Sequence, residues 1–223
     1  PGGMFSEQMS AALYLAHPYR LPVIGWMHDI ESRTLQDAID WYQKWYVPNN
    51  AILVVAGDTT LAEVLPLAEK YYGVIPRGEQ PLRDRPQEPP QLAERRITYY
   101  DDRVRQPSFS RSYITNSRTA RVGTAPALTL LSDILSSSTG RLYQSLVVDQ
   151  GIAVSSGAFY GGNSVDQTQF GVWVAPRIDS DIAVMEAALD AELDKLLADG
   201  VTEEELRLAK TGALTSLVFR RDS

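Results

Sequence analysis

Residues 46–60 read Tyr-Val-Pro-Asn-Asn-Ala-Ile-Leu-Val-Val-Ala-Gly-Asp-Thr-Thr, and this stretch decides how the rest of the chain is interpreted. Its centre, residues 51–56, is a continuous apolar run rich in β-branched side chains, with turn-forming residues on both sides. Such a run is typical of a strand that is buried on both faces of a sheet. Thr60 and Glu63 then form a capping box, which predicts a helix that begins there and ends at Gly73. The stretch therefore predicts a strand, a tight turn and a helix.

A strand buried on both faces needs neighbouring strands, and residues 1–50 contain no other convincing one. Residues 4–16 have the apolar spacing of a helix, and a second helix begins at Thr34. Two explanations remain open. Either residues 92–175 supply the neighbours, or the neighbours lie outside this chain, which would then be a piece of a larger protein.

A boundary follows the helix. Five of the chain's 13 prolines lie between Pro76 and Pro90, interleaved with charged residues. Such a composition is typical of an extended, semi-rigid linker. We therefore expect three parts: residues 1–75, a linker over 76–91, and a second domain over 92–223.

The second domain is predicted to be α+β. Its pattern reads strand, strand, helix, helix, strand, strand, helix, helix, over residues 96–100, 108–114, 124–135, 141–148, 152–160, 167–175, 181–198 and from Thr202 onward. The strands at 152–160 and 167–175 are expected to form a hairpin. This order favours a two-layer fold, an antiparallel sheet with helices packed on one face.

Composition excludes several classes of function. The 223 residues carry a net charge of −7, and no basic block forms a nucleic-acid surface. No apolar run approaches the length of a membrane span. The chain has no cysteine, which excludes thiolate chemistry and leaves the compartment open.

The residues that could carry chemistry are few. A catalytic zinc site normally takes three protein ligands, and this chain has two histidines, His17 and His28, and no cysteine. His28 and Glu31 begin an H-x-x-E-H pattern, but Ser32 stands where its second histidine belongs. We therefore predict no catalytic residue and no metal ligand in this chain, with His28 in a loop and His17 as a packing or capping residue.

Several short motifs, taken in order, resemble the insulinase/pitrilysin (M16) family of zinc peptidases. They are His-Pro-Tyr at 17–19, Pro-Val-Ile-Gly at 22–25, Tyr-Val-Pro-Asn-Asn at 46–50, Val-Val-Ala-Gly-Asp at 54–58, Ala-Glu-Lys-Tyr-Tyr-Gly at 68–73, Gly-Arg-Leu-Tyr-Gln at 140–144, Gly-Ile-Ala at 151–153 and Gly-Val-Thr-Glu-Glu-Glu-Leu at 200–206. Together they cover most of residues 5–220. Each motif is modest by itself, and their order makes them specific.

The resemblance implies a zinc endopeptidase built from paired α+β domains that clamp a peptide between two bowl-shaped halves. The family's zinc ligands, two histidines of H-x-x-E-H and a downstream glutamate, precede the His-Pro-Tyr motif, so none maps onto this chain. Residues 1–75 would be the C-terminal part of the first M16-type domain, and residues 92–223 a non-catalytic second domain that is incomplete at its C-terminus. The partners of strand 51–56 would lie upstream.

The resemblance also marks a substrate-binding pair. Family members that supply the half of the clamp without zinc carry an arginine and a tyrosine seven residues apart, and the matching positions here are Val147 and Val154. Neither valine can donate a hydrogen bond to a peptide. Two interpretations follow: the parent is a zinc peptidase of which this chain is an inactive portion, or it is a catalytically dead homologue that acts as a partner or scaffold subunit. In either case the resemblance implies that the intact protein acts on a peptide substrate. It also implies that the protein associates with a second M16-type subunit or with itself. It also suggests a periplasmic location.

Overall fold

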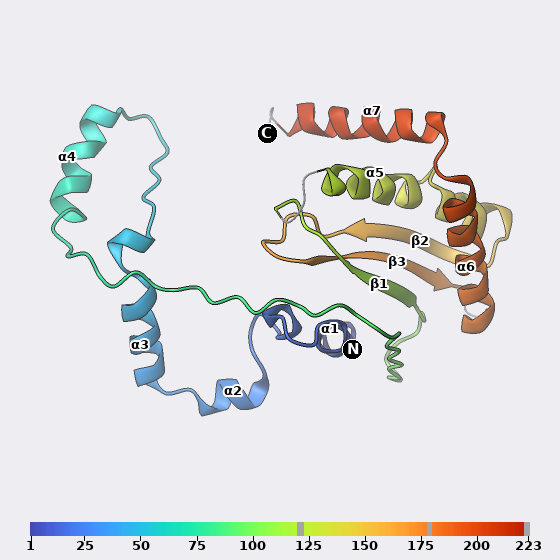
Figure 1. The fold of residues 1–223 in the computed structure, drawn as a ribbon, viewed down its shortest axis with the longest axis horizontal. Helices are drawn as coiled ribbons and strands as arrows, with labels where there is room; N and C mark the ends of the chain where they lie inside the picture. The colour runs from blue at the N-terminus through green and yellow to red at the C-terminus, as the bar shows by residue number, and fades with distance from the viewer. Residues whose placement is uncertain (120–122, 178–179, 221–223) are drawn as a thin grey trace. The chain divides into compact units, whose positions relative to one another are not determined.

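The structure is a computed structural model that describes residues 1–119, 123–177 and 180–220 (Figure 1). Contacts within the chain divide it into two compact units. Unit 1 comprises Pro1–Leu13 and Glu88–Ser223, and unit 2 comprises Tyr14–Gln87. Each unit is described by itself.

Unit 1 is built on a three-stranded antiparallel sheet. Its strands are β1 (Phe109–Thr115), β2 (Ala153–Tyr160) and β3 (Thr168–Pro176), in the order β1-β3-β2. In the register, Val172 of β3 lies opposite Arg111 of β1 and Ala158 of β2. The predicted hairpin of two strands over 152–160 and 167–175 is confirmed, and so is the α+β class.

Helical segments bury one face of this sheet. They are α5 (Thr124–Ser136), the π-helix η3 (Tyr143–Asp149) and α6 (Ile182–Asp199), and α7 (Glu203–Phe219) packs on α5. Alternate residues of β3 point into these helices because side chains of a strand alternate between its two faces. The buried core consists of Leu135, Leu142, Leu146, Ala153, Phe170, Val172, Val174, Met185 and Leu189.

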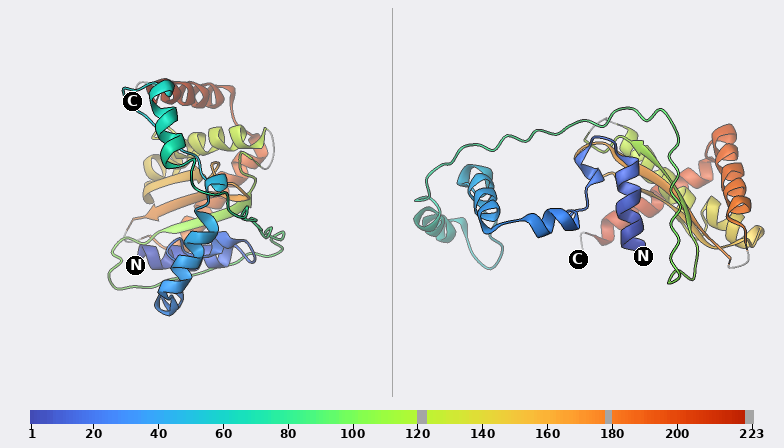
Figure 2. Two further views of the ribbon diagram at one scale, coloured as in Figure 1. Left: turned by 90° about the vertical axis from the view of Figure 1, so that its left-hand side faces the viewer. Right: turned by 90° about the horizontal axis from the view of Figure 1, so that it is seen from below.

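Helix α1 (Gly2–Leu13) contacts the opposite face of the sheet. Ser110 lies opposite Trp173 in the register, on the side away from the core, and its Oγ is 4.0 Å from Sδ of Met9. The right-hand view of Figure 2 shows α1 and α6 on different sides of the strands. The sequence prediction places these residues with the first domain, over 1–75, whereas their contacts group them with Glu88–Ser223.

Two aromatic rings lie across glycines on this same face. A Cβ added to Gly157 would be 2.9 Å from Nε1 of Trp173, and one added to Gly171 would overlap the ring of Phe159. Both pairs are directly opposed across β2 and β3. The glycines are therefore required for the close approach of the rings to the sheet.

The strand predicted over residues 96–100 is not present. The segment lies extended, and its odd-numbered side chains are the less exposed ones, as a strand would have them. However, side chains of this region contact α1: Arg95 Nη1 donates to the Leu13 carbonyl (2.8 Å), and Tyr99 packs near Phe5 with ring centres 6.3 Å apart. The exposure of the side chains does alternate along this segment, but its backbone pairs with no strand among the described residues.

The regular elements of unit 2 are helical. Its elements are η1 (Pro18–Arg20), α2 (Met27–Ser32), α3 (Leu35–Trp45), η2 (Pro48–Asn50) and α4 (Leu61–Tyr71). The capping boxes of Thr34 with Asp37 and of Thr60 with Glu63 are both formed. Helix α2 was not predicted, because its first residue follows Trp26, which makes no side-chain cap.

The strand predicted over residues 51–56 is also absent. Ala51 is extended, with φ −118° and ψ 152°, but no strand pairs with the segment in the part of the chain that the structure describes. Its side chains are exposed, Ile52 by 90% and Val54 by 80%. The prediction of a strand buried on both faces is therefore wrong for this chain, because residues 92–175 form their own sheet and do not supply the neighbours.

Among the described residues, no helix is both long enough and apolar enough to cross a membrane.

Candidate functional site

The two histidines lie in different surroundings. His17 is 2% exposed and packs against Tyr19, with ring centres 4.2 Å apart. Its Nδ1 accepts a hydrogen bond from the Tyr19 backbone N–H (3.2 Å), which caps the short helix η1. The structure therefore gives His17 the packing and capping role that the sequence predicts.

His28 lies on α2 and not in a loop, so that part of the prediction is wrong. Its side chain is 79% exposed, and its Nε2 is 3.4 Å from Oδ1 of Asp29. Ser32 is the last residue of α2, and its Oγ donates to the carbonyl of Asp29. The helical setting of an H-x-x-E-H motif is thus partly present, but serine replaces the ligand.

These side chains do not fit a zinc ion. A zinc site needs three or four nitrogen, sulfur or carboxylate donors that converge on one point. His17 uses Nδ1 for a backbone hydrogen bond, and His28 points to a single neighbouring carboxylate. In the described ranges no group of three or more histidine, aspartate or glutamate side chains could hold a metal ion.

Val147 and Val154, the positions of the family's substrate-binding pair, lie in unit 1. Val147 belongs to the π-helix η3 and packs against the buried core. Val154 lies at an irregularity in β2, where the register shifts between Ala153 and Ser155, and it is 49% exposed. One valine is therefore a packing residue, and the other presents an apolar side chain to the surface.

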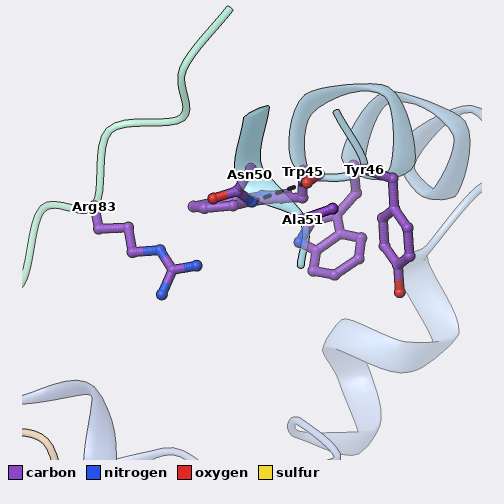
Figure 3. A pocket seen from close by; sticks show the side chains of 6 residues that line it. Trp45, Tyr46, Asn50, Ala51 and Arg83 are labelled. Carbon is purple, nitrogen blue, oxygen red and sulfur yellow. Dashed lines mark hydrogen bonds between the residues drawn. The ribbon is translucent and has the colours of Figure 1, made fainter. Parts of the chain in front are cut away.

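A pocket lies on unit 2, with a volume of about 340 Å³. It is lined by Trp41, Trp45, Tyr46, Asn50, Ala51 and Arg83 (Figure 3). The rings come from the C-terminal end of α3, and the guanidinium of Arg83 lies 5.7 Å from the centre of the Trp45 ring. Asn50 Nδ2 donates to the Trp45 carbonyl (2.9 Å), which closes the turn after the helix.

The lining of this pocket is mainly aromatic. Its rings can stack on a flat apolar group, and an arginine above an aromatic face is a cation–π arrangement. Arg83 is not predictable from the sequence because it lies in the proline-rich segment, and no spacing rule links that segment to a helix so far upstream.

Comparison with known proteins adds a family and a fold. A family model described as the peptidase M16 inactive domain matches residues 32–213. The zinc protease PqqE of Helicobacter pylori is 25% identical over 228 residues, which covers 100% of this chain and 50% of that protein. This chain therefore spans about half the length of that relative.

Solved structures agree with this fold. The crystal structure of a protease from Helicobacter pylori superimposes with a TM-score of 0.86 at 24% identity, covering 100% of this chain and 54% of that one. The periplasmic protease PqqL of Escherichia coli gives a TM-score of 0.76 at 20% identity, covering 100% of this chain and 25% of that one.

Proposed function

Because this chain belongs to the peptidase M16 family, we propose that it is the non-catalytic portion of a zinc-dependent endopeptidase and forms part of the clamp that encloses a peptide. The observation that carries the proposal is the match to the family's inactive domain over residues 32–213, which includes parts of both compact units. Similarity to a zinc protease over the whole chain supports zinc in the parent protein. The catalytic ion and the residue that activates water would be supplied from outside this chain.

We propose that the division of the chain follows the family's domains. Residues 1–75 belong to the end of the first M16-type domain, 76–91 link the two, and 92–223 are the second, non-catalytic domain. The packing of α1 on the sheet of unit 1 then means that a helix of the first domain helps to cover the sheet of the second.

Val147 and Val154 bear on which half of a clamp the parent supplies. A subunit that carries zinc does not need the arginine and tyrosine that hold the substrate in its partner, so apolar residues can occupy both positions. We favour this zinc-bearing half, which would act with a second M16-type subunit. The same valines fit a catalytically dead scaffold subunit, and this is the second candidate function. PqqL is described as periplasmic, which supports a periplasmic location for the parent.

Peptide cleavage by the intact parent protein tests the proposal. The parent is assayed with an unstructured peptide, with and without a zinc chelator, and with and without any M16-type protein encoded beside it. Cleavage that the chelator abolishes and the neighbour promotes supports the zinc-bearing half. Absence of cleavage in every pairing, together with absence of zinc in the purified parent, would instead support the scaffold subunit.

The chain alone provides a second measurement. After dialysis against trace zinc, elemental analysis of the 223-residue chain should find well under one equivalent, because its two histidines do not converge. One tightly held equivalent would contradict this, and His17→Ala and His28→Ala would then identify the ligand.

A further inference from the structure

Residues 78–83 of the proline-rich segment, which we call the strap, are held against the helical part of unit 2. The backbone N–H of Gly78 donates to Oδ1 of Asn49 (3.0 Å). Nδ2 of the same asparagine donates to Oε1 of Gln80 (2.9 Å). Asn49 lies in η2, immediately after α3, so one side chain forms two hydrogen bonds to the strap.

The start of the strap also fits closely against the turn before η2. A Cβ added to Gly78 would overlap the side chain of Val47. The absence of a side chain at Gly78 therefore allows its backbone to come close enough for the hydrogen bond to Asn49. At its other end the strap is held by Arg83, whose guanidinium lies over the Trp45 ring.

Between these two attachments the strap covers a cavity of about 560 Å³. Gln43, Lys44 and Val47 line it on one side, and residues 78–82 line it on the other. The strap is thus attached near its ends and does not pack along its whole length. Its position depends on a few contacts, of which the two hydrogen bonds of Asn49 are the most directional.

We propose that Asn49 is a positioning residue that anchors the strap, so that residues 78–83 move with the helices of unit 2 as one body. The chain also joins the two units between Leu13 and Tyr14. In the proline-rich connection, any movement between the units must then be taken up after Arg83, although composition alone predicts an extended linker from residue 76 onward. This inference concerns the chain itself and holds whether or not the parent is a peptidase.

Amide hydrogen exchange of Gly78 tests the anchor, because this amide is the donor to Asn49. In the 223-residue chain, we expect the Gly78 amide to be protected and Asn49→Ala to accelerate its exchange at least about tenfold, as loss of a hydrogen bond of about 1.4 kcal/mol would. Asn49→Asp keeps an oxygen that accepts from Gly78 and should retain most of the protection. Asn50→Ala is the matched control: it removes a neighbouring side chain that bonds the Trp45 carbonyl and should leave the Gly78 rate unchanged.

A second variant changes the strap and leaves unit 2 intact. Gly78→Ala places a methyl group against Val47 and should lift the strap, so that trypsin cleaves after Arg77 several-fold faster than in the natural chain. Unchanged circular dichroism would show that the helices remain folded. An unprotected Gly78 amide in the natural chain would overturn the proposal, and so would equal acceleration by Asn49→Ala and Asn50→Ala. Failure of Asn49→Asp to retain protection, or unchanged cleavage in Gly78→Ala, would also contradict it.

Discussion

Removing the negative charge of Glu205 should destabilise unit 1, and the loss should depend on pH. Arg141 holds this carboxylate with both arms of its guanidinium: Nε donates to Oε1, and Nη2 donates to Oε2 at 2.7 Å. The same carboxylate accepts from the backbone N–H of Thr202 (2.7 Å) in the capping box of α7. One side chain therefore joins the start of α7 to the chain segment that precedes η3.

The size of the effect follows from the pKa of Glu205. The hydrogen bond from Arg141 is the main cause that lowers this pKa from 4.5 to about 2, with a further contribution from Thr202. A pKa lowered that far corresponds to at most roughly 3 kcal/mol of stability. Because a quarter of the Glu205 side chain is exposed, solvent screening reduces this, and we expect Glu205→Gln to cost about 1–2 kcal/mol at pH 7. Glutamine can still accept from Thr202, so the helix cap is largely kept.

The sign of the pH dependence is fixed by the direction of the pKa shift. A carboxylate whose pKa is lowered in the folded chain contributes its full stability above its unfolded pKa. The contribution is lost as the pH falls toward the folded value. The difference between the natural chain and Glu205→Gln should therefore be constant between about pH 7 and 5, shrink below pH 4.5 and vanish near pH 2.

The assay must report on unit 1 alone, because three of the four tryptophans lie in unit 2. Urea unfolding followed by pulse-labelled amide exchange in peptides of β3 and α6 meets this need. Glu204→Gln on the same helix is the matched control: its partner is Arg207, both side chains are 63% exposed, and it should behave as the natural chain does. Equal effects of the two substitutions would refute the reasoning, as would a loss in Glu205→Gln that persists unchanged at about pH 3.

Three further outcomes are expected. Ser156→Ala should leave the stability of unit 1 unchanged or raise it by up to about 1 kcal/mol, because the Oγ of Ser156 is buried without a hydrogen-bond partner among the described residues. Urea unfolding measures this, and a clear loss of stability would contradict it. Gly171→Ala should cost about 1–3 kcal/mol because the methyl group meets the ring of Phe159, and it should cost much less in a Phe159→Ala background, as a double-mutant cycle would show. Val54→Lys should reduce the self-association that sedimentation measures at high protein concentration, because the exposed apolar segment 51–56 is a template for pairing with another chain. A natural chain that stays monomeric at every concentration would contradict this.

Local signals predict the helices of this chain well. The helix starts expected at Thr34, Thr60 and Thr202 are all present, and each is fixed by a capping box between residues three positions apart. The hairpin of β2 and β3 is also predictable, since its strands are close in sequence and Phe170, Val172 and Val174 recur at every second position of β3. Helix α2 is not predicted from the sequence because it has only six residues and no side-chain cap.

The two predicted strands that the structure lacks, over residues 51–56 and 96–100, show a limit of local sequence patterns. A strand is defined by a backbone partner, and the sequence of a segment does not say whether that partner is present. Residues 51–56 have the composition of a buried strand, but no described segment pairs with them. Residues 96–100 have the alternation of a strand, but the side chains of this region contact a helix.

For the candidate site too, the sequence predicts some features and does not predict others. The order of the motifs predicts the family, which the match over residues 32–213 confirms. The contacts of Asn49 and Arg83 are out of reach of sequence patterns, because each joins segments that are far apart in the chain. The residues around Asn49 indicate only a turn before a strand.

The packing of α1 also sets an order of assembly during synthesis. Met9 and Ser110 are separated by 101 residues, and all of unit 2 is made between them. A ribosome adds about 5–20 residues per second, so α1 waits on the order of ten seconds before β1 emerges. The apolar side of α1 has no sheet to cover during this interval. Helix α1 is therefore made before unit 2 but reaches this position on the sheet only after unit 2 has been made.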